Sequence, residues 1–310
     1  MNDHKKILVV GSLNMDVLVK ADEKPSRGQS VLGSHFGLYP GGKGANQAVQ
    51  AARLGAEVIM FGRVGEDMFG EQLVNSLQQA GVIVDHIRKD AQDGTGMGCV
   101  FGDKHGDNWI VVVPRANMNW QTEDTAMLPQ LLEQCGMVVI QLEIPMPIVV
   151  ETVTRAHEMN IPVMLNPAPA LDIPAGLLKK IDILIPNESE AEFYTGIKIA
   201  DIESAKKAAL ELCKRGAARV IVTLGKNGAV LCEGGHACHY AAYSVEAQDA
   251  TAAGDAFCGA LAVAILKGQA MDAAMAFAGA AGAFCATRLG AQPSLGTLAE
   301  IQTFMDTHSL

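Results

Sequence analysis

The chain has 310 residues, of which 49% are hydrophobic and 5% aromatic, and its formal net charge is −10. This length and apolar content are sufficient for a large buried core, and the acidic charge argues against a nucleic-acid or anionic-membrane surface. A phosphate ligand remains compatible with that charge, because backbone N–H groups bind phosphate without a net positive charge. The 32 glycines and the few aromatic residues favour closely packed α/β layers over an aromatic-rich β-sandwich.

The cysteines and the apolar runs indicate a cytoplasmic protein. Seven cysteines are present, an odd number, and no two form a C-x-x-C pair, which is typical of buried free thiols in a reducing compartment. The first apolar run, residues 7–10, is too short for the core of a signal peptide. The alanine-rich stretch 256–286 is interrupted by Lys267 and Asp272. Neither half reaches the ~20 residues that span a bilayer.

Short β-branched runs alternate with longer helical patterns along the chain. The strands are expected at 7–10, 57–61, 137–141, 162–165, 181–185 and 219–223. The helices are expected at 47–54, 70–80, 148–159, 204–215, 255–267, 271–287 and 298–307. This alternation predicts one α/β domain over residues 1–310, with a mostly parallel sheet covered by helices on both faces.

Two segments, 17–39 and 94–113, break this alternation. Both are richer in turn residues and in alternating apolar and polar residues. Residues 102–107 predict a hairpin turn between two strands. The two segments are therefore expected to form a small separate sheet that projects from the main body.

A glycine-rich segment, PGGKGANQA at 40–48, precedes a predicted helix. It partly matches the Walker A pattern, but Gly44 follows Lys43 where Ser or Thr should hold magnesium, and no strong strand leads in. One interpretation is a plain turn that caps the helix. The other is a loop whose glycines let a ligand approach the backbone, with Lys43 and Asn46 offering hydrogen bonds to hydroxyl groups.

A second segment, DATAAGDAF at 249–257, opens a long apolar helix. Its small residues leave the first N–H groups of the helix uncovered, which favours an anion site. An Asp at a helix start is usually an N-cap. Here, however, Asp249 lies one loop earlier, and Asp255 directly follows Gly254 at the anion site itself. A carboxylate beside a phosphate suits a base that deprotonates an attacking hydroxyl group.

Three weaker motifs follow predicted strands. Residues 223–228, TLGKNG, form either an ordinary turn or a nucleotide loop at the carboxyl end of a strand. Residues 186–192, PNESEAE, form a helix cap whose Asn187 and Glu190 can also orient waters on magnesium. In residues 11–16, GSLNMD, an extended chain points Asn14 and Asp16 the same way, which suits paired sugar hydroxyls, although a polar turn would look alike.

A histidine- and cysteine-rich turn raises the possibility of zinc. It contains Cys232, His236, Cys238 and His239. Their spacing matches no standard zinc site, and both flanks indicate hairpin strands. We therefore do not expect zinc there.

Together, these motifs resemble the ribokinase family, also called the PfkB carbohydrate kinases, along nearly the whole chain. The matching segments are 11–16, 41–48, 166–170 (NPAPA), 186–190, 249–255 and 290–294. The resemblance implies a Rossmann-like α/β domain with a β-sheet lid. The lid would come from about residues 17–39 and 94–113, and in this family it is often used to form a homodimer. It also implies transfer of the ATP γ-phosphoryl group to the 5-hydroxyl of ribose.

The resemblance further implies roles for single residues. Asp255 matches the catalytic base, and the backbone of Ala252, Ala253, Gly254 and Asp255 matches the anion hole. The sugar contacts would be Asn14, Asp16, Gly42, Lys43, Asn46, Glu143 and Asp255. The nucleotide positions would be Asn187, Thr223, Leu224, Gly225, Lys226, Asn227, Gly228, Gly254 and Gly279. Glu190 would bind magnesium indirectly, through water molecules. A potassium site would use Asp249, Thr251, Cys285, Arg288, Gly290 and Ser294, mostly through backbone carbonyls.

Three departures from the family pattern leave the sugar open. Arg115 stands where glycine is usual, and would contact substrate or phosphate or face solvent. Gly279 stands at a position where the family often has a polar residue. Met15 stands where the family commonly has a smaller residue. The alternatives are another free sugar, a nucleoside, a sugar phosphate, or a non-catalytic sugar sensor. Nucleosides usually need aromatic stacking surfaces, which are scarce here, and the intact Gly254 and Asp255 argue against a sensor.

Overall fold

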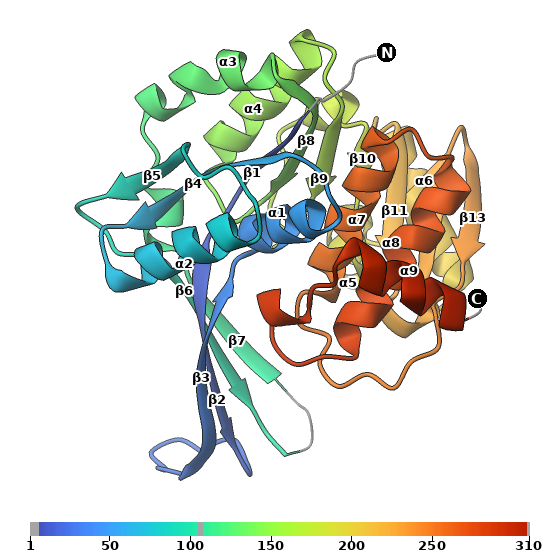
Figure 1. Cartoon of the computed structure of the whole chain (residues 1–310). Coiled ribbons are helices and arrows are strands. Elements are labelled where there is room, and N and C mark those ends of the chain that lie inside the picture. Colours follow the sequence, from blue (N-terminus) through green and yellow to red (C-terminus); the bar gives the residue numbers. More distant parts are fainter. Residues whose placement is uncertain (1–5, 105–107, 309–310) are drawn as a thin grey trace.

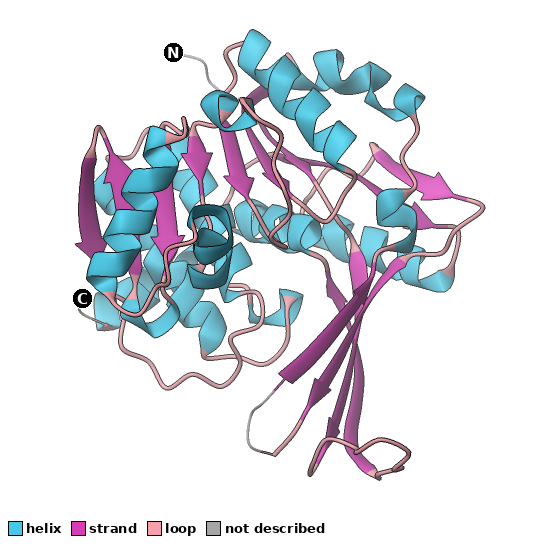
Figure 2. Cartoon of the chain, turned by 180° about the vertical axis from the view of Figure 1, so that it is seen from behind, coloured by secondary structure: helices cyan, strands magenta, loops and turns pink. Residues whose placement is uncertain are grey.

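In this computed structural model, which describes residues 6–104 and 108–308, a nine-stranded sheet forms the centre of the molecule and helices cover both of its faces (Figure 1). A second, four-stranded sheet extends away from this body. Seen from behind, its long strands lie below the helices as a separate arm (Figure 2).

The large sheet is mostly parallel. Its strands, in spatial order, are β13 (His236–Tyr240), β12 (Ala229–Glu233), β11 (Arg219–Thr223), β10 (Ile183–Leu184), β9 (Val163–Asn166), β8 (Cys135–Gln141), β1 (Lys6–Val10), β4 (Val58–Gly65) and β5 (Ile87–Asp90). The strands from β11 to β5 in this order pair in parallel, and β12 and β13 add an antiparallel edge. On the central strand β1, Ile7 and Val9 face one core and Leu8 and Val10 the other, because successive side chains alternate.

Helices cover both faces of this sheet. One face packs against α1 (Lys43–Arg53), α2 (Met68–Gln79), α7 (Ala253–Leu266), α8 (Met271–Ala286) and α9 (Leu298–Thr307). The other packs against α3 (Leu128–Leu132), α4 (Met146–Glu158), α5 (Glu188–Thr195) and α6 (Ile202–Lys214). Short 3₁₀ turns lie at η1 (Arg115–Met118), η2 (Thr122–Met127), η3 (Leu177–Lys180), η4 (Gly225–Asn227) and η5 (Gln292–Ser294). None of the helices in the described ranges is long and apolar enough to cross a membrane.

The small sheet has two chemically different faces. Its spatial order is β3 (Gly33–Gly41), β2 (Asn14–Ala21), β6 (Gly96–Gly102) and β7 (Asn108–Val113). The strand register places an apolar row across one face, formed by Leu38, Val17, Cys99 and Val111. The alternate residues of β2, namely Asp16, Leu18 and Lys20, point to the opposite face and line a cavity of about 260 Å³.

The predicted α/β class, with a mostly parallel sheet between helices and a second small sheet, is confirmed. Residues 105–107 of the predicted hairpin turn lie outside the described residues, but β6 and β7 on either side of it pair antiparallel. Strand β5 was not predicted, because its sequence IRKD carries three charges and no apolar alternation.

Candidate active site

Between β1 and β8, the side on which the chain adds strands to the large sheet reverses. From β1 the chain builds β4 and β5 on one side, and from β8 it builds β9 and β10 on the other. Open α/β sheets bind ligands outside the carboxyl ends of their strands at such a point. The loops that leave β1 and β8 here carry residues 11–13 and 142–145.

Glu143, just after β8, collects hydrogen bonds from both sides of this point. Its Oε2 accepts from Ser12 Oγ at 2.5 Å and from Asn14 Nδ2 at 3.4 Å. The backbone N–H of Lys43, the first residue of α1, donates to the same oxygen at 3.5 Å. One carboxylate therefore joins the end of β1, the start of β2 and the start of α1.

Gly42 lets the glycine-rich loop lie directly on the end of β1. Its φ is +90°, which side chains other than glycine rarely adopt, and an added Cβ would come within 2.6 Å of the Asn14 nitrogen. The loop therefore packs on the end of β1 and also begins α1. It brings Lys43 and Asn46, on the first turn of α1, to the same place as Asn14.

Asp16 sits in a narrow slot of the small sheet. A Cβ on Gly41 or on Gly98 would come within 2.1 or 2.2 Å of its carboxylate oxygens, so both flanking glycines leave it room. Burial raises the pKa of Asp16 to about 7, and the nearby carboxylates of Glu143 and Asp255 add to the rise, while Lys43 opposes it.

Asp255 lies in the first turn of α7 and is only 7% exposed. Helix α7 packs against α1, which supplies two amide groups to the carboxylate. Asn46 Nδ2 donates to Oδ2 and Gln47 Nε2 donates to Oδ1, both at 2.9 Å. Burial raises the pKa of Asp255, while Lys43 and the two amide donors oppose that rise.

Two backbone amides at the start of α7 donate to no acceptor among the described residues. Ala253 N–H donates to Ala250 O and Ala256 N–H to Ala252 O. Within the described part of the chain, the N–H groups of Gly254 and Asp255 between them have no acceptor. A Cβ added to Gly254 would meet no atom within 4 Å, so the space beside these amides is open. The αL conformation of Ala252, with φ +62°, turns the chain into the helix without a side-chain cap.

Lys43 is the cation among these acids. Burial alone would lower its pKa, but Asp255, Glu143 and Glu190 raise it overall. Lys43 therefore stays charged at neutral pH, among carboxylates that come from α7, α5 and the loop after β8.

Most of the predicted nucleotide positions, Asn187 and residues 223–228, lie at the ends of β10 and β11. Asn187 forms a bridge with Thr223, and Thr223 N–H donates to Pro186 O at 3.0 Å. Residues 224–228 then form a tight turn, closed by a 2.8 Å hydrogen bond from Leu224 N–H to Gly228 O. It holds Gly225, Lys226 and Asn227. Gly279, on α8, leaves open space, since an added Cβ would meet only Tyr243, at 4.0 Å.

Asn187 and Glu190 cap α5 reciprocally. Asn187 Oδ1 accepts from Glu190 N–H at 2.8 Å, and Asn187 Nδ2 donates to Glu190 Oε1 at 2.9 Å. Glu190 is buried, which raises its pKa, and both Asn187 and Lys43 oppose that rise. The predicted capping motif is thus present, and its carboxylate is hydrogen-bonded to Asn187 through both oxygens.

The residues predicted for potassium lie around one loop. Asp249 accepts from Thr251 N–H at 2.9 Å and from Gly290 N–H at 3.0 Å. Cys285 Sγ lies 3.0 Å from Ser294 Oγ and 3.4 Å from Thr251 O. The Arg288 side chain turns away to Glu300 and stacks on Phe284, so only its backbone carbonyl is available to this loop.

The turn after β7 fixes Asn14 from the other side. Asn117 Nδ2 donates to Asn14 Oδ1 at 2.7 Å and to Leu13 O at 3.0 Å, and its Oδ1 accepts from Leu13 N–H at 2.9 Å. Because Asn14 Oδ1 is thereby occupied, Asn14 Nδ2 faces Glu143. Arg115, two residues earlier with φ +46°, pairs with Asp93 at 3.2 Å and covers Gly94.

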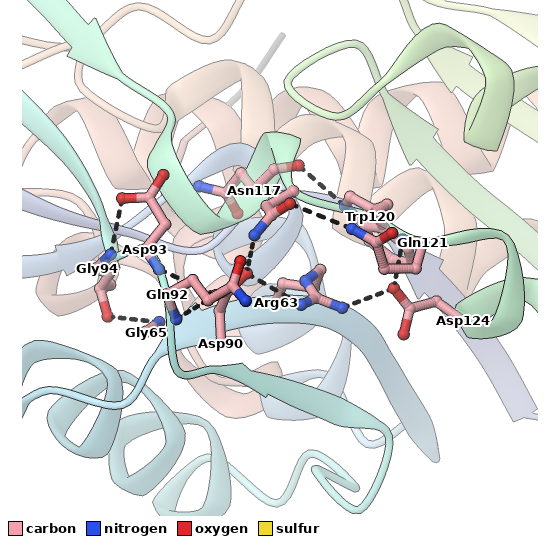
Figure 3. Close-up of polar contacts among 12 residues, drawn as sticks. Arg63, Gly65, Asp90, Gln92, Asp93, Gly94, Asn117, Trp120, Gln121 and Asp124 are labelled. Atoms are coloured by element: carbon pink, nitrogen blue, oxygen red, sulfur yellow. Dashed lines mark hydrogen bonds and ion pairs between the residues drawn. The ribbon is translucent and has the colours of Figure 1, made fainter.

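A buried ion-pair network holds this turn on the sheet (Figure 3). Arg63 of β4 donates to Asp90 at 3.0 Å and to Asp124 at 2.6 Å. Asp90 also accepts from Asn119 Nδ2 at 2.6 Å. The residues that follow Asn117 are therefore anchored to β4 and β5 of the large sheet.

Comparison with known proteins shows the family of the chain. The model of the pfkB family carbohydrate kinases matches residues 4–298. The chain belongs to this family. This carbohydrate kinase is 36% identical over 302 residues to a ribokinase of Haemophilus influenzae, covering 97% of this chain and 99% of that protein. It is 31% identical over 300 residues to a deoxyribokinase of Salmonella typhi, covering 96% and 98%. The solved ribokinase of Arabidopsis thaliana, complexed with ribose and ATP, superposes with a TM-score of 0.89 at 31% identity, covering 97% and 98%.

Sequence reasoning missed several polar residues of this carbohydrate kinase. Ser12 and Gln47 lie inside recognised motifs, but their partners, Glu143 and Asp255, are 131 and 208 positions away. Asn117 follows Arg115 in a segment considered only for its arginine. Gln141 ends an apolar strand, and no pattern in that strand indicates what its side chain meets.

Proposed function

We propose that this kinase phosphorylates ribose with ATP, adding the γ-phosphoryl group to the 5-hydroxyl, with Asp255 as general base. The observation that carries the proposal is the buried Asp255 carboxylate, which stands in the same helix turn as the free amides of Gly254 and Asp255. The ribokinase relatives and the neighbour complexed with ribose and ATP support this pair of substrates.

The sugar would lie between the small sheet and α1. The carboxylates of Asp16 and Glu143 accept hydrogen bonds from its hydroxyls, and the Asn14 amide and Lys43 donate to it. Asn46 Oδ1 is buried and has no partner within the described residues, so it supplies a further acceptor. A buried acceptor without a partner suits a hydroxyl donor delivered by the ligand.

The reaction is an in-line displacement. Asp255 takes the proton from the attacking hydroxyl as the oxygen bonds to phosphorus and the bond to ADP breaks. The raised pKa makes this carboxylate a better base, while Lys43 and the two amides favour its ionised form. The free amides and the positive end of the α7 dipole stabilise charge on the transferred group.

Two metal ions fit the side chains present. Magnesium would be held through water by Glu190 and Asn187 and would neutralise phosphate charge, since Mg²⁺ keeps much of its hydration shell. Potassium would be held at the loop of Asp249 and Thr251, next to the free amides, by carboxylate and carbonyl oxygens from there and from residues 285–294. Both ions prefer oxygen ligands, which these segments offer.

The small sheet would act as a lid and as a dimer contact. Its polar face, with Asp16 and Lys20, borders the 260 Å³ cavity, whose other wall includes Asp249 and Thr251. Closing this space would exclude water from the reaction. The outer face carries exposed Phe36 and Val111, and an apolar sheet face of this kind is typical of a protein contact.

An ADP-release assay over a panel of acceptors tests the proposal. The panel contains ribose, 2-deoxyribose, fructose and adenosine, each with ATP and magnesium, with and without potassium. We expect the highest kcat/KM for ribose, with ribose 5-phosphate as product and faster turnover in potassium. The deoxyribokinase relative makes 2-deoxyribose the second candidate. A higher kcat/KM for 2-deoxyribose, fructose or adenosine would make that compound, and not ribose, the preferred substrate. The absence of ADP release with every acceptor would contradict the proposed activity.

A further inference from the structure

We infer that Gln47 and Gln141 are positioning residues of this kinase, which hold the Asp255 carboxylate in the orientation that accepts the proton. This inference rests on the proposed role of Asp255 as base. Neither glutamine is among the sugar, nucleotide or metal positions. Both are buried, and Gln141 is 0% exposed.

Each oxygen of the Asp255 carboxylate receives one amide N–H from consecutive residues of α1. Asn46 donates to Oδ2 and Gln47 donates to Oδ1. Two donors fix the plane of the carboxylate, and each oxygen retains a lone pair for the sugar hydroxyl. Gln47 is the donor that faces away from the sugar residues, because its Nε2 also donates to Asn166 Oδ1 of β9, at 3.2 Å.

The direction of donation is forced along the whole chain of amides. Asn166 Nδ2 donates to Ile185 O at 2.9 Å, so Asn166 Oδ1 can only accept. The ionised Asp255 carboxylate can also only accept. Gln47 must therefore turn its Nε2 toward both acceptors, which leaves its Oε1 in need of a donor.

Gln141 is that donor. Its Nε2 donates to Gln47 Oε1 at 2.7 Å from the end of β8. Gly11 makes this arrangement possible, because an added Cβ there would lie 2.1 Å from Gln141 Oε1. Without Gln141, the Gln47 oxygen would be buried without a partner, and its amide would be free to turn away from Asp255.

Other titratable groups also interact electrostatically with Asp255, and they contribute to its pKa in every variant of the test. They are Lys43 from α1, Asp16 from β2, Glu190 from α5, Cys258 from α7 and Cys285 from α8. None of them is altered by changing a glutamine. A shift seen only in the glutamine variants therefore reports the lost amide donor.

The test compares the pH dependence of kcat in the full chain and in Gln141→Met, Gln47→Leu and the double variant. Losing the amide donor raises the pKa of Asp255, so the acid limb should move to higher pH by about one unit, with KM for ribose changed less than about threefold. Since Gln141 acts through Gln47, the double variant should shift no further than Gln47→Leu alone.

Gln50→Met is the matched control. Gln50 is equally buried on α1 and donates to Gly296 O at 2.9 Å, away from Asp255. The Gln50→Met variant should have a lower melting temperature, but the acid limb of its kcat–pH profile should not move. An acid limb that stays in place in Gln47→Leu would overturn the inference, as would equal shifts in Gln50→Met. If Gln141→Met fails to fold, the position of the acid limb in Gln47→Leu still tests the inference.

Asp255→Asn separates this inference from the proposed function. Near-normal turnover in Asp255→Asn would refute the base itself. Loss of turnover in Asp255→Asn with unmoved acid limbs in the glutamine variants would refute only the positioning role.

Discussion

Among single residues, Asp16 is expected to couple sugar binding to pH, if it contacts the sugar as proposed. Its pKa of about 7 means that it is partly protonated at neutral pH, and a protonated carboxyl loses an acceptor for sugar hydroxyls. We expect the Kd for ribose to be about tenfold higher at pH 6 than at pH 8, because only the ionised form binds well. Calorimetric titration without nucleotide measures this. Asp16→Asn should bind weakly at both pH values, so an unchanged tenfold dependence in that variant would contradict the assignment.

The same pKa predicts a stability change of opposite sign. A carboxyl group whose folded-state pKa lies above its unfolded value stabilises the protein below pH 4, and this contribution is lost as pH rises through about 7. Asp16→Asn should therefore raise the melting temperature of the ligand-free chain at pH 8 and change it little at pH 4.

Asn117 should matter for the sugar although it does not line the sugar site. Asn117→Ala removes three hydrogen bonds that fix Leu13 and Asn14. We expect KM for ribose to rise about tenfold with KM for ATP unchanged, as measured by steady-state kinetics. Asn119→Ala, in the same turn but bonded to Asp90, should leave KM for ribose near normal. Equal effects of the two variants would mean that Asn117 is only structural.

Among the elements, the turn that follows β7 depends on Arg63. Its guanidinium is buried between Asp90 and Asp124, which lie on β5 and η2 (Figure 3). Arg63→Met would leave both carboxylates buried without their cation and should lower the free energy of unfolding by about 3–5 kcal/mol. Urea denaturation measures this. Arg155→Met breaks an exposed pair with Glu151 and should cost less than ~0.5 kcal/mol.

The elements also show where sequence reasoning succeeds and where it stops. The alternation of buried strands and amphipathic helices predicted the large sheet, because both periodicities are local. Strand β5 and the turns at 115–127 were not predicted, since charged residues such as Asp90 and Asp124 are buried there through pairing with Arg63 of β4. The glycine-rich and DATAAGD motifs were found because helix starts with small residues have a local pattern. The amide chain from Gln141 to Asp255 was not, because its members meet only in the folded sheet.

For the whole molecule, the outer face of the small sheet predicts a homodimer. Phe36 is 65% exposed and Val111 63% exposed, on opposite edge strands of an apolar face. Phe36→Asp should shift the chain from dimer to monomer in sedimentation equilibrium. Phe193→Asp, at an exposed aromatic on α5, should leave the assembly unchanged. A parent chain that is monomeric at micromolar concentration would contradict the prediction.

The most direct test of the central claim is the pairing of turnover and ribose binding in Asp255→Asn. Asparagine keeps the shape of the side chain but cannot take a proton from the sugar hydroxyl. We predict that kcat falls by at least about 10²-fold, while the Kd for ribose stays within about threefold of the parent value. A variant that turns over at a near-normal rate would contradict the account of this kinase.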